Sequence, residues 1–229
     1  MTITRDEYSP SVRRVLELPR PRWRGVMHRW MVPVSVVAMI WLTASAESAG
    51  AAAVAALYGL ASVGLYAVSA TAHYKVWEPK RLHLLFQFDH SMIMIFMVAS
   101  TAPVAYAVSG GTGWLLFGGM VVGVSAGLTA IWLPFHPPRG FMNTLFFMVG
   151  WWPVLFVVPI ANGLGGTGIG LLLGGGAVFT IGALIVGSQR PNPNPHVFGY
   201  HEIWHIFVVL GNAIHYALVY AVVTGKTPF

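Results

Sequence analysis

Two histidines near the end of the sequence, His201 and His205, lie four residues apart inside an apolar stretch. On an α-helix this spacing puts both imidazoles on one face, about one turn from each other. Two imidazoles placed in this way can bind one metal ion. Because burying such groups in a bilayer is costly, histidines on membrane helices usually face the protein interior or a water-filled cavity. The pair therefore predicts a buried metal site that takes further ligands from elsewhere in the chain.

Two other apolar stretches carry polar groups that can complete this site. Ser69 and His73 end one stretch, and Asp89 lies in the next. Three imidazoles can hold Zn²⁺ with a fourth position open for water, whose pKa the metal lowers toward neutrality. We expect His73, His201 and His205 to be the ligands. Asp89 is expected to act as the base or to orient a ligand imidazole. Ser69, on the same helix face as His73, is expected to donate a hydrogen bond to the water or to a substrate oxyanion.

The composition indicates a membrane protein. Of the 229 residues, 56% are hydrophobic and only 9% are charged, whereas about one quarter of a soluble domain is charged. The sequence has no cysteine, which excludes disulfides and thiolate metal sites, so a metal would be held by histidine and carboxylate. The net charge of +6 comes from basic residues at the ends of apolar stretches, where they suit lipid headgroups. We therefore expect membrane lipids as partners and no nucleic acid.

Seven apolar segments long enough to cross a bilayer follow an Arg-rich N-terminal region. We predict an all-α membrane protein with a cytoplasmic polar tail at residues 1–24 and one seven-helix transmembrane domain at residues 25–229. The predicted segments are residues 26–45, 51–73, 82–108, 114–133, 141–160, 168–187 and 198–223.

The basic residues predict the orientation of these segments. They precede the first segment and follow the second, the fourth (Arg139) and the sixth, whereas the opposite side has Lys226 alone. By the positive-inside rule the N-terminus is cytoplasmic and the C-terminus outside, in the inner (plasma) membrane. The five candidate site residues would then all lie in the inner half of the bilayer, at similar depths.

The motifs resemble those of a known family. The pattern S-x-x-x-H ending at His73, D-H-S from Asp89 and G-Y-H-E-I-W-H ending at His205 is similar to the hemolysin III family, the bacterial branch of the progestin and adipoQ receptor group. The resemblance covers residues 26–223. It implies a zinc ion within the membrane near the cytoplasmic face, bound by three histidines beside an Asp and a Ser. The matching positions are His73, His201, His205, Asp89 and Ser69. The group is also compared with ceramidases, which implies hydrolysis of an amide or ester in a lipid-like substrate.

Several other interpretations of the same residues stay open. His201-Glu-Ile-Trp-His205 matches the zinc-metalloprotease signature in which the glutamate is the base, so Glu202 competes with Asp89 for that role. The family name suggests a membrane-lytic protein or a channel with structural zinc, and a lipid-sensing receptor or a bis-histidine haem protein are further alternatives. Polar contacts between helices would use the same side chains without a metal. His28, beside Arg29 at the start of a segment, is interpreted as an interfacial, solvated residue.

Overall fold

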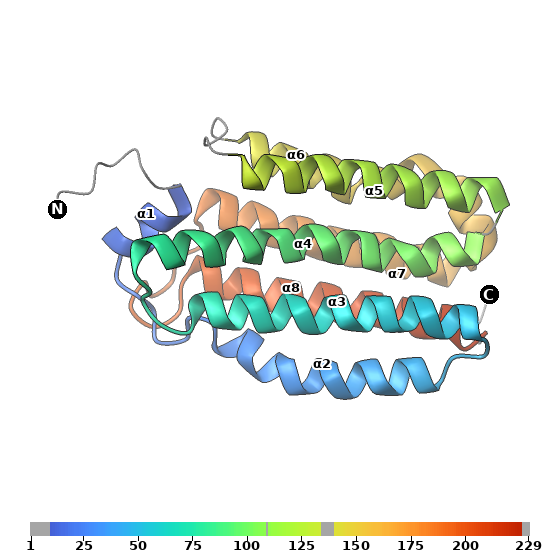
Figure 1. Cartoon of the computed structure of the whole chain (residues 1–229), viewed down its shortest axis with the longest axis horizontal. Helices are drawn as coiled ribbons and strands as arrows, with labels where there is room; N and C mark the ends of the chain where they lie inside the picture. Colours follow the sequence, from blue (N-terminus) through green and yellow to red (C-terminus); the bar gives the residue numbers. More distant parts are fainter. Residues whose placement is uncertain (1–9, 109, 134–139, 226–229) are drawn as a thin grey trace.

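The protein is a bundle of long helices (Figure 1). The computed structural model describes residues 10–108, 110–133 and 140–225, so Arg139 and Lys226 lie outside the described residues. Within these ranges the one β feature is an isolated bridge between Asn194 and Phe198. The predicted all-α class is confirmed. In chain order the helices are α1 (Pro10–Glu17), α2 (Val26–Ala44), α3 (Ala49–His73), α4 (Pro79–Val108), α5 (Gly110–Trp132), α6 (Phe141–Gly150), the 3₁₀ helix η1 (Trp152–Phe156), α7 (Val157–Ser188) and α8 (Tyr200–Val223).

Six helical stretches among the described residues are long and apolar enough to cross a membrane. Five of them are single helices: α2, α3, α4, α5 and α8. The sixth, Phe141–Ser188, has 48 residues and contains α6, η1 and α7. As one straight helix it would be about 70 Å long, more than twice the hydrocarbon thickness of a bilayer.

This long stretch folds back on itself at Gly165. Gly165 has φ 65° and ψ −174°, a non-helical conformation inside α7 that glycine adopts without steric cost. On either side of it, Trp151 Nε1 donates to Thr180 Oγ1 at 3.0 Å, and a Cβ on Gly187 would lie 3.8 Å from Asn143 Nδ2. The two halves therefore run side by side in opposite directions, as the two predicted segments do. Seven membrane crossings and the orientation of the termini stay predictions.

Helix α8 lies in the middle of the bundle, where it contacts α2, α3, α4 and α7. The largest core cluster joins buried residues of α2, α3, α4 and α8, among them Tyr58, Tyr66 and Val208. Small residues let the helices approach closely: a Cβ on Gly59 of α3 would lie 2.7 Å from Met39 Cβ and 3.1 Å from Met39 Cα in α2. This is the packing mode expected of helices in membranes.

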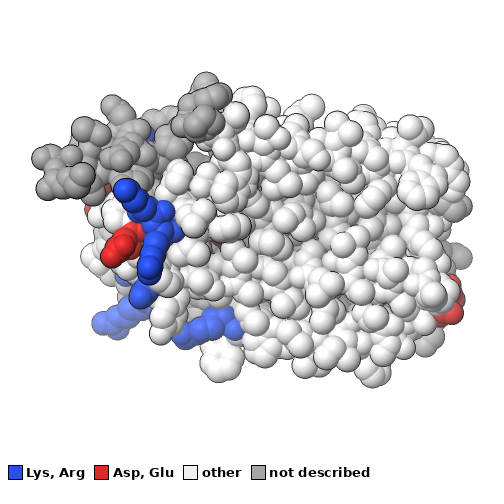
Figure 2. Space-filling model, viewed as in Figure 1, with Lys and Arg blue, Asp and Glu red and all other residues white. Residues whose placement is uncertain are grey.

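Basic side chains gather at one end of the bundle, beside α1 and the start of α2, while the long middle of the visible face has no charged residue (Figure 2). The N-terminal end of α8 and the C-terminal end of α3 lie at this same end (Figure 1). The candidate site residues at those helix ends are therefore close to the charged surface.

The close contact of α2 and α3 gives a stability prediction. Gly59→Ala should lower the free energy of unfolding by about 1–3 kcal/mol, because the new methyl group overlaps Met39 near its backbone. Gly118→Ala, in α5 with nothing within 4 Å of its Cβ, is the matched control and should be neutral or stabilising. Unfolding curves in a neutral detergent measure both. Equal stability of the two variants would contradict the packing described.

Candidate metal site

Three histidines from two helices that are far apart in the sequence converge at the basic end of the bundle. His73 is the last residue of α3, and His201 and His205 lie in the first two turns of α8. One nitrogen from each imidazole lies within 4.8 Å of the other two. His73 and His205 are 3% and 2% exposed. The predicted ligand residues are therefore brought together in a group that could hold a metal ion.

The distance between His73 and His201 fits two ligands of one ion. His73 Nε2 and His201 Nε2 are 3.2 Å apart. Two nitrogens bound tetrahedrally to zinc at about 2.05 Å each lie about 3.3 Å from one another. Three neutral donors with no thiolate suit Zn²⁺ with an open fourth position. The residues present thus fit the predicted zinc ion, although the same donors also suit other transition metals.

Asp89 lies beside the His73 imidazole, and Ser69 precedes His73 by one turn in α3. Asp89, in α4, places Oδ2 at 3.6 Å from His73 Nε2, and its side chain is 14% exposed. That distance is longer than a hydrogen bond, so the carboxylate remains able to accept a proton from another group next to His73. Ser69 is buried in α3, one turn before His73, where side chains lie about 6 Å apart at Cβ. The structure thus places Asp89 next to His73, while the roles of Asp89 and Ser69 stay predictions.

The structure adds a fourth histidine to the site. His28 of α2 is 2% exposed, so its interpretation as an interfacial residue is wrong. Its ring stacks on that of His205, with centroids 3.9 Å apart and planes 13° apart, and meets Tyr66 edge-on at 5.1 Å. Neither ring nitrogen makes a hydrogen bond of ordinary geometry within the described residues. The stack fixes the plane of the His205 ring.

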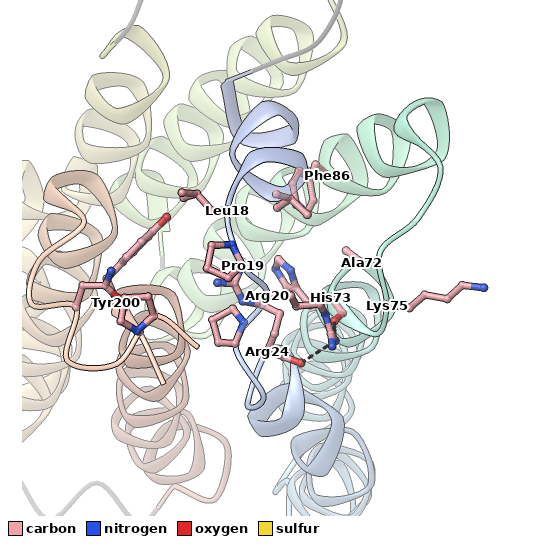
Figure 3. Close-up of a pocket in the computed structure, with 14 residues that line it drawn as sticks. Leu18, Pro19, Arg20, Arg24, Ala72, His73, Lys75, Phe86 and Tyr200 are labelled. Atoms are coloured by element: carbon pink, nitrogen blue, oxygen red, sulfur yellow. Dashed lines mark hydrogen bonds between the residues drawn. The ribbon is translucent and has the colours of Figure 1, made fainter. Parts of the chain in front are cut away.

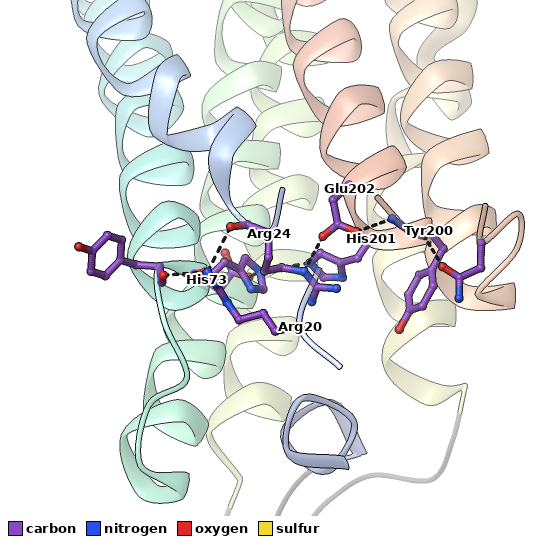
Figure 4. Close-up of polar contacts among 10 residues, drawn as sticks. Arg20, Arg24, His73, Tyr200, His201 and Glu202 are labelled. Atoms are coloured by element: carbon purple, nitrogen blue, oxygen red, sulfur yellow. Dashed lines mark hydrogen bonds and ion pairs between the residues drawn. The ribbon is translucent and has the colours of Figure 1, made fainter. Parts of the chain in front are cut away.

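The segment between α1 and α2 is pressed against His73. Gly25, the N-cap of α2, has φ 75°, and a Cβ there would lie 2.8 Å from His73 Cβ. Arg20 Nη2 donates to the backbone oxygens of His73 at 2.6 Å and Tyr74 at 2.7 Å (Figure 4). Because the last carbonyl groups of a helix lack partners within the helix, this arginine caps the end of α3. It also holds the segment over the site.

A buried ion pair ties the same segment to α8. Arg24 Nε donates to Glu202 Oε1 at 2.6 Å, and the two side chains are 15% and 0% exposed (Figure 4). The other oxygen of Glu202 accepts from the backbone N–H of Gly199, the N-cap residue of α8, at 2.8 Å. Both carboxylate oxygens are therefore engaged, next to His201 in the sequence.

A cavity of about 200 Å³ reaches His73 from the basic end. Apolar groups such as Leu18 and Phe86 line it together with Arg20, Arg24 and Tyr200, while Lys75 extends away from the others (Figure 3). Pockets that enclose drug-sized ligands have volumes of about 300–1,000 Å³. This cavity is therefore smaller than such pockets.

The sequence matches one family model over most of its length. The model described as "Haemolysin-III related" matches residues 16–216, which include all the candidate site residues. The chain belongs to the haemolysin-III related family. It is a multi-pass membrane protein, and the predicted resemblance is confirmed.

Family members from bacteria and animals are similar to the chain over most of its length. It is 29% identical to Hemolysin-3 of Bacillus cereus over 81% of this chain and 84% of that protein. A Hemolysin-3 homolog of Bacillus subtilis is 27% identical over 90% and 94%. The human monocyte to macrophage differentiation factor is 24% identical over 84% and 80%. Sequence similarity to the chain thus extends from bacterial to human proteins.

The Arg24–Glu202 pair gives a prediction about stability. Arg24→Leu should lower the free energy of unfolding by about 3 kcal/mol, because it leaves a fully buried carboxylate without its cation. Adding Glu202→Gln should recover part of this loss, since a neutral amide oxygen can still accept from Gly199. Arg22→Leu, an exposed position in the same segment, serves as the control. Wild-type stability of Arg24→Leu in detergent unfolding would show that the pair contributes nothing.

Proposed function

We propose that this haemolysin-III related protein is a zinc-dependent hydrolase that cleaves an amide or ester bond in a lipid-like substrate. The observation that carries the proposal is the convergence of His73, His201 and His205 within 4.8 Å, with the Asp89 carboxylate 3.6 Å from His73. Three nitrogen ligands and a neighbouring carboxylate are the parts that metal-assisted hydrolysis needs. The metal and the catalytic roles are proposals.

The roles of the side chains follow from their positions. A zinc ion held by the three imidazoles would supply Lewis acidity that lowers the pKa of a water. Asp89 would take the proton of that water as it attacks the carbonyl carbon, and later deliver it to the leaving amine or alcohol as the C–N or C–O bond breaks. Ser69 would donate a hydrogen bond to the oxyanion. His28, stacked on His205, would keep that ligand in its orientation.

Asp89 is a better candidate for the base than Glu202. Both oxygens of Glu202 are engaged, one by Arg24 and one by Gly199. A glutamate base of the H-E-x-x-H type needs a free oxygen toward the metal. The Asp89 carboxylate, by contrast, lies next to His73. This difference argues against the mechanism of the H-E-x-x-H metalloproteases, in which the glutamate is the base.

The proposed orientation gives the site access to lipids. Seven crossings with the N-terminus in the cytoplasm would put the histidines just below the headgroups of the inner leaflet of the plasma membrane. The cavity at His73 is lined by apolar and basic groups together, which suits the junction of acyl chain and headgroup. A lipid could then present an amide or ester near its headgroup to the site.

Metal analysis tests the site directly. The purified protein should contain one zinc ion per chain, and His201→Ala should lose most of it, because two imidazoles hold zinc far more weakly than three. His196→Gln, in an exposed loop position, should retain the metal. Elemental analysis by mass spectrometry measures the content. A His201→Ala variant with full zinc would refute the assignment of ligands.

Substitution of the proposed base tests the catalytic step. Asp89→Asn should keep the zinc but lower the hydrolysis rate by about 10²–10⁴-fold, the usual contribution of a positioned base. Ser69→Ala should lower it by a smaller factor. Glu202→Gln should affect stability more than rate. Release of fatty acid from N-acyl and O-acyl lipids measures the reaction, and an undiminished rate in Asp89→Asn would show that another group is the base.

A second candidate function comes from the name of a relative. The Bacillus cereus protein, 29% identical to this chain, is named Hemolysin-3, which suggests membrane lysis. The same variants separate the two functions. Leakage of liposomes or erythrocytes that persists in Asp89→Asn would be independent of hydrolysis, and the zinc would then have a structural role. Leakage that disappears together with hydrolysis would be a consequence of it.

A further inference from the structure

A second cavity, outside the histidine group, collects four arginines. Its volume is about 140 Å³, several times the roughly 30 Å³ that a water molecule occupies in the liquid. The segment before α2 and the first turns of α2 supply most of its lining, and the end of α3 supplies the rest. The four arginines are Arg20, Arg22, Arg24 and Arg29.

The positive charge of this cavity is only partly balanced by the described part of the chain. Within the described residues one carboxylate pairs with these arginines, that of Glu202, which is fully buried against Arg24. Arg22 and Arg29 are exposed, and their side chains have no acidic partner in the described chain. Burial lowers the pKa of the Arg20 guanidinium, and repulsion from Arg24 lowers it further, whereas Glu202 raises it. The arginines are therefore held together against their mutual repulsion.

We propose that this cavity binds a phosphate group. Four guanidinium groups offer many donors in flat forks that match the oxygens of a phosphate. The N-terminal end of α2, at Gly25 and Val26, lines the same cavity, and its dipole adds attraction for an anion. The group can belong to an anionic lipid headgroup or to inorganic phosphate, because both present the same oxygens.

Two of the four arginines connect the phosphate site to the histidine group. Arg20 donates to the backbone oxygen of His73, and Arg24 pairs with Glu202, beside His201. Both also line the cavity at His73. An anion that neutralises these arginines would stabilise the segment that covers the site. The phosphate site does not depend on the proposed hydrolysis, since the charge and the cavity are present in either case.

The experiment compares two arginines of the cavity with one elsewhere. Arg22→Gln and Arg29→Gln remove side chains that make no hydrogen bond or ion pair to the histidine group within the described residues. Arg190→Gln removes an exposed charge that does not line the cavity. Calorimetry in neutral detergent measures binding of inorganic phosphate. It also measures binding of a short-chain phosphatidylglycerol, with phosphatidylcholine of the same chain length as the reference. Unfolding curves establish that each variant is folded.

Each cavity variant should weaken binding of the favoured probe about tenfold, the effect of losing one charge-assisted contact. Arg190→Gln should change it less than twofold. If phosphatidylglycerol binds and inorganic phosphate does not, the cavity recognises a lipid headgroup. If both bind, the phosphate group alone is sufficient for recognition. The proposal is overturned if neither probe binds, or if Arg190→Gln weakens binding as much as Arg22→Gln does.

Discussion

Burying polar side chains among apolar helices is the constraint on which this structure depends. Imidazoles and carboxylates inside a membrane protein are costly unless they find partners. Here His73, His201 and His205 are each other's neighbours, and Asp89 lies beside the first of them. These side chains can meet only if α8 contacts α3 and α4, and α8 does contact both of these helices and α2. The central position of α8 and the grouping of the histidines are thus two aspects of one requirement.

The N-terminal segment completes this arrangement from outside the bundle. Its arginines satisfy groups that the helices leave unpaired. Arg20 donates hydrogen bonds to backbone carbonyl oxygens at the end of α3, and Arg24 forms an ion pair with the buried carboxylate of Glu202. Backbone hydrogen bonds from Arg22 and Trp23 to the loop before α8 add to the contact. The segment therefore joins the ends of α3 and α8, the two helices that supply the imidazoles.

The sequence was informative wherever the signal is local. Apolar length predicted the helices, and helical spacing predicted that His201 and His205 share a face, because both depend on residues close in the chain. The pairing of Glu202 with Arg24, 178 residues away, depends on tertiary packing, as does the stacking of His28 on His205. Neither follows from periodicity. A histidine one turn into an apolar segment, where α2 begins, was the available signal for His28.

The order of the three imidazoles along the chain makes their assembly a late event in biogenesis. One arrives with α3, whereas the other two arrive with α8, the last helix described. A nascent polypeptide that stalls before α8 has docked holds only one of the three candidate ligands, His73, which by itself would bind a divalent cation weakly. Binding of a metal ion would then require the complete bundle, and it would distinguish fully folded molecules from those in which α8 has not docked.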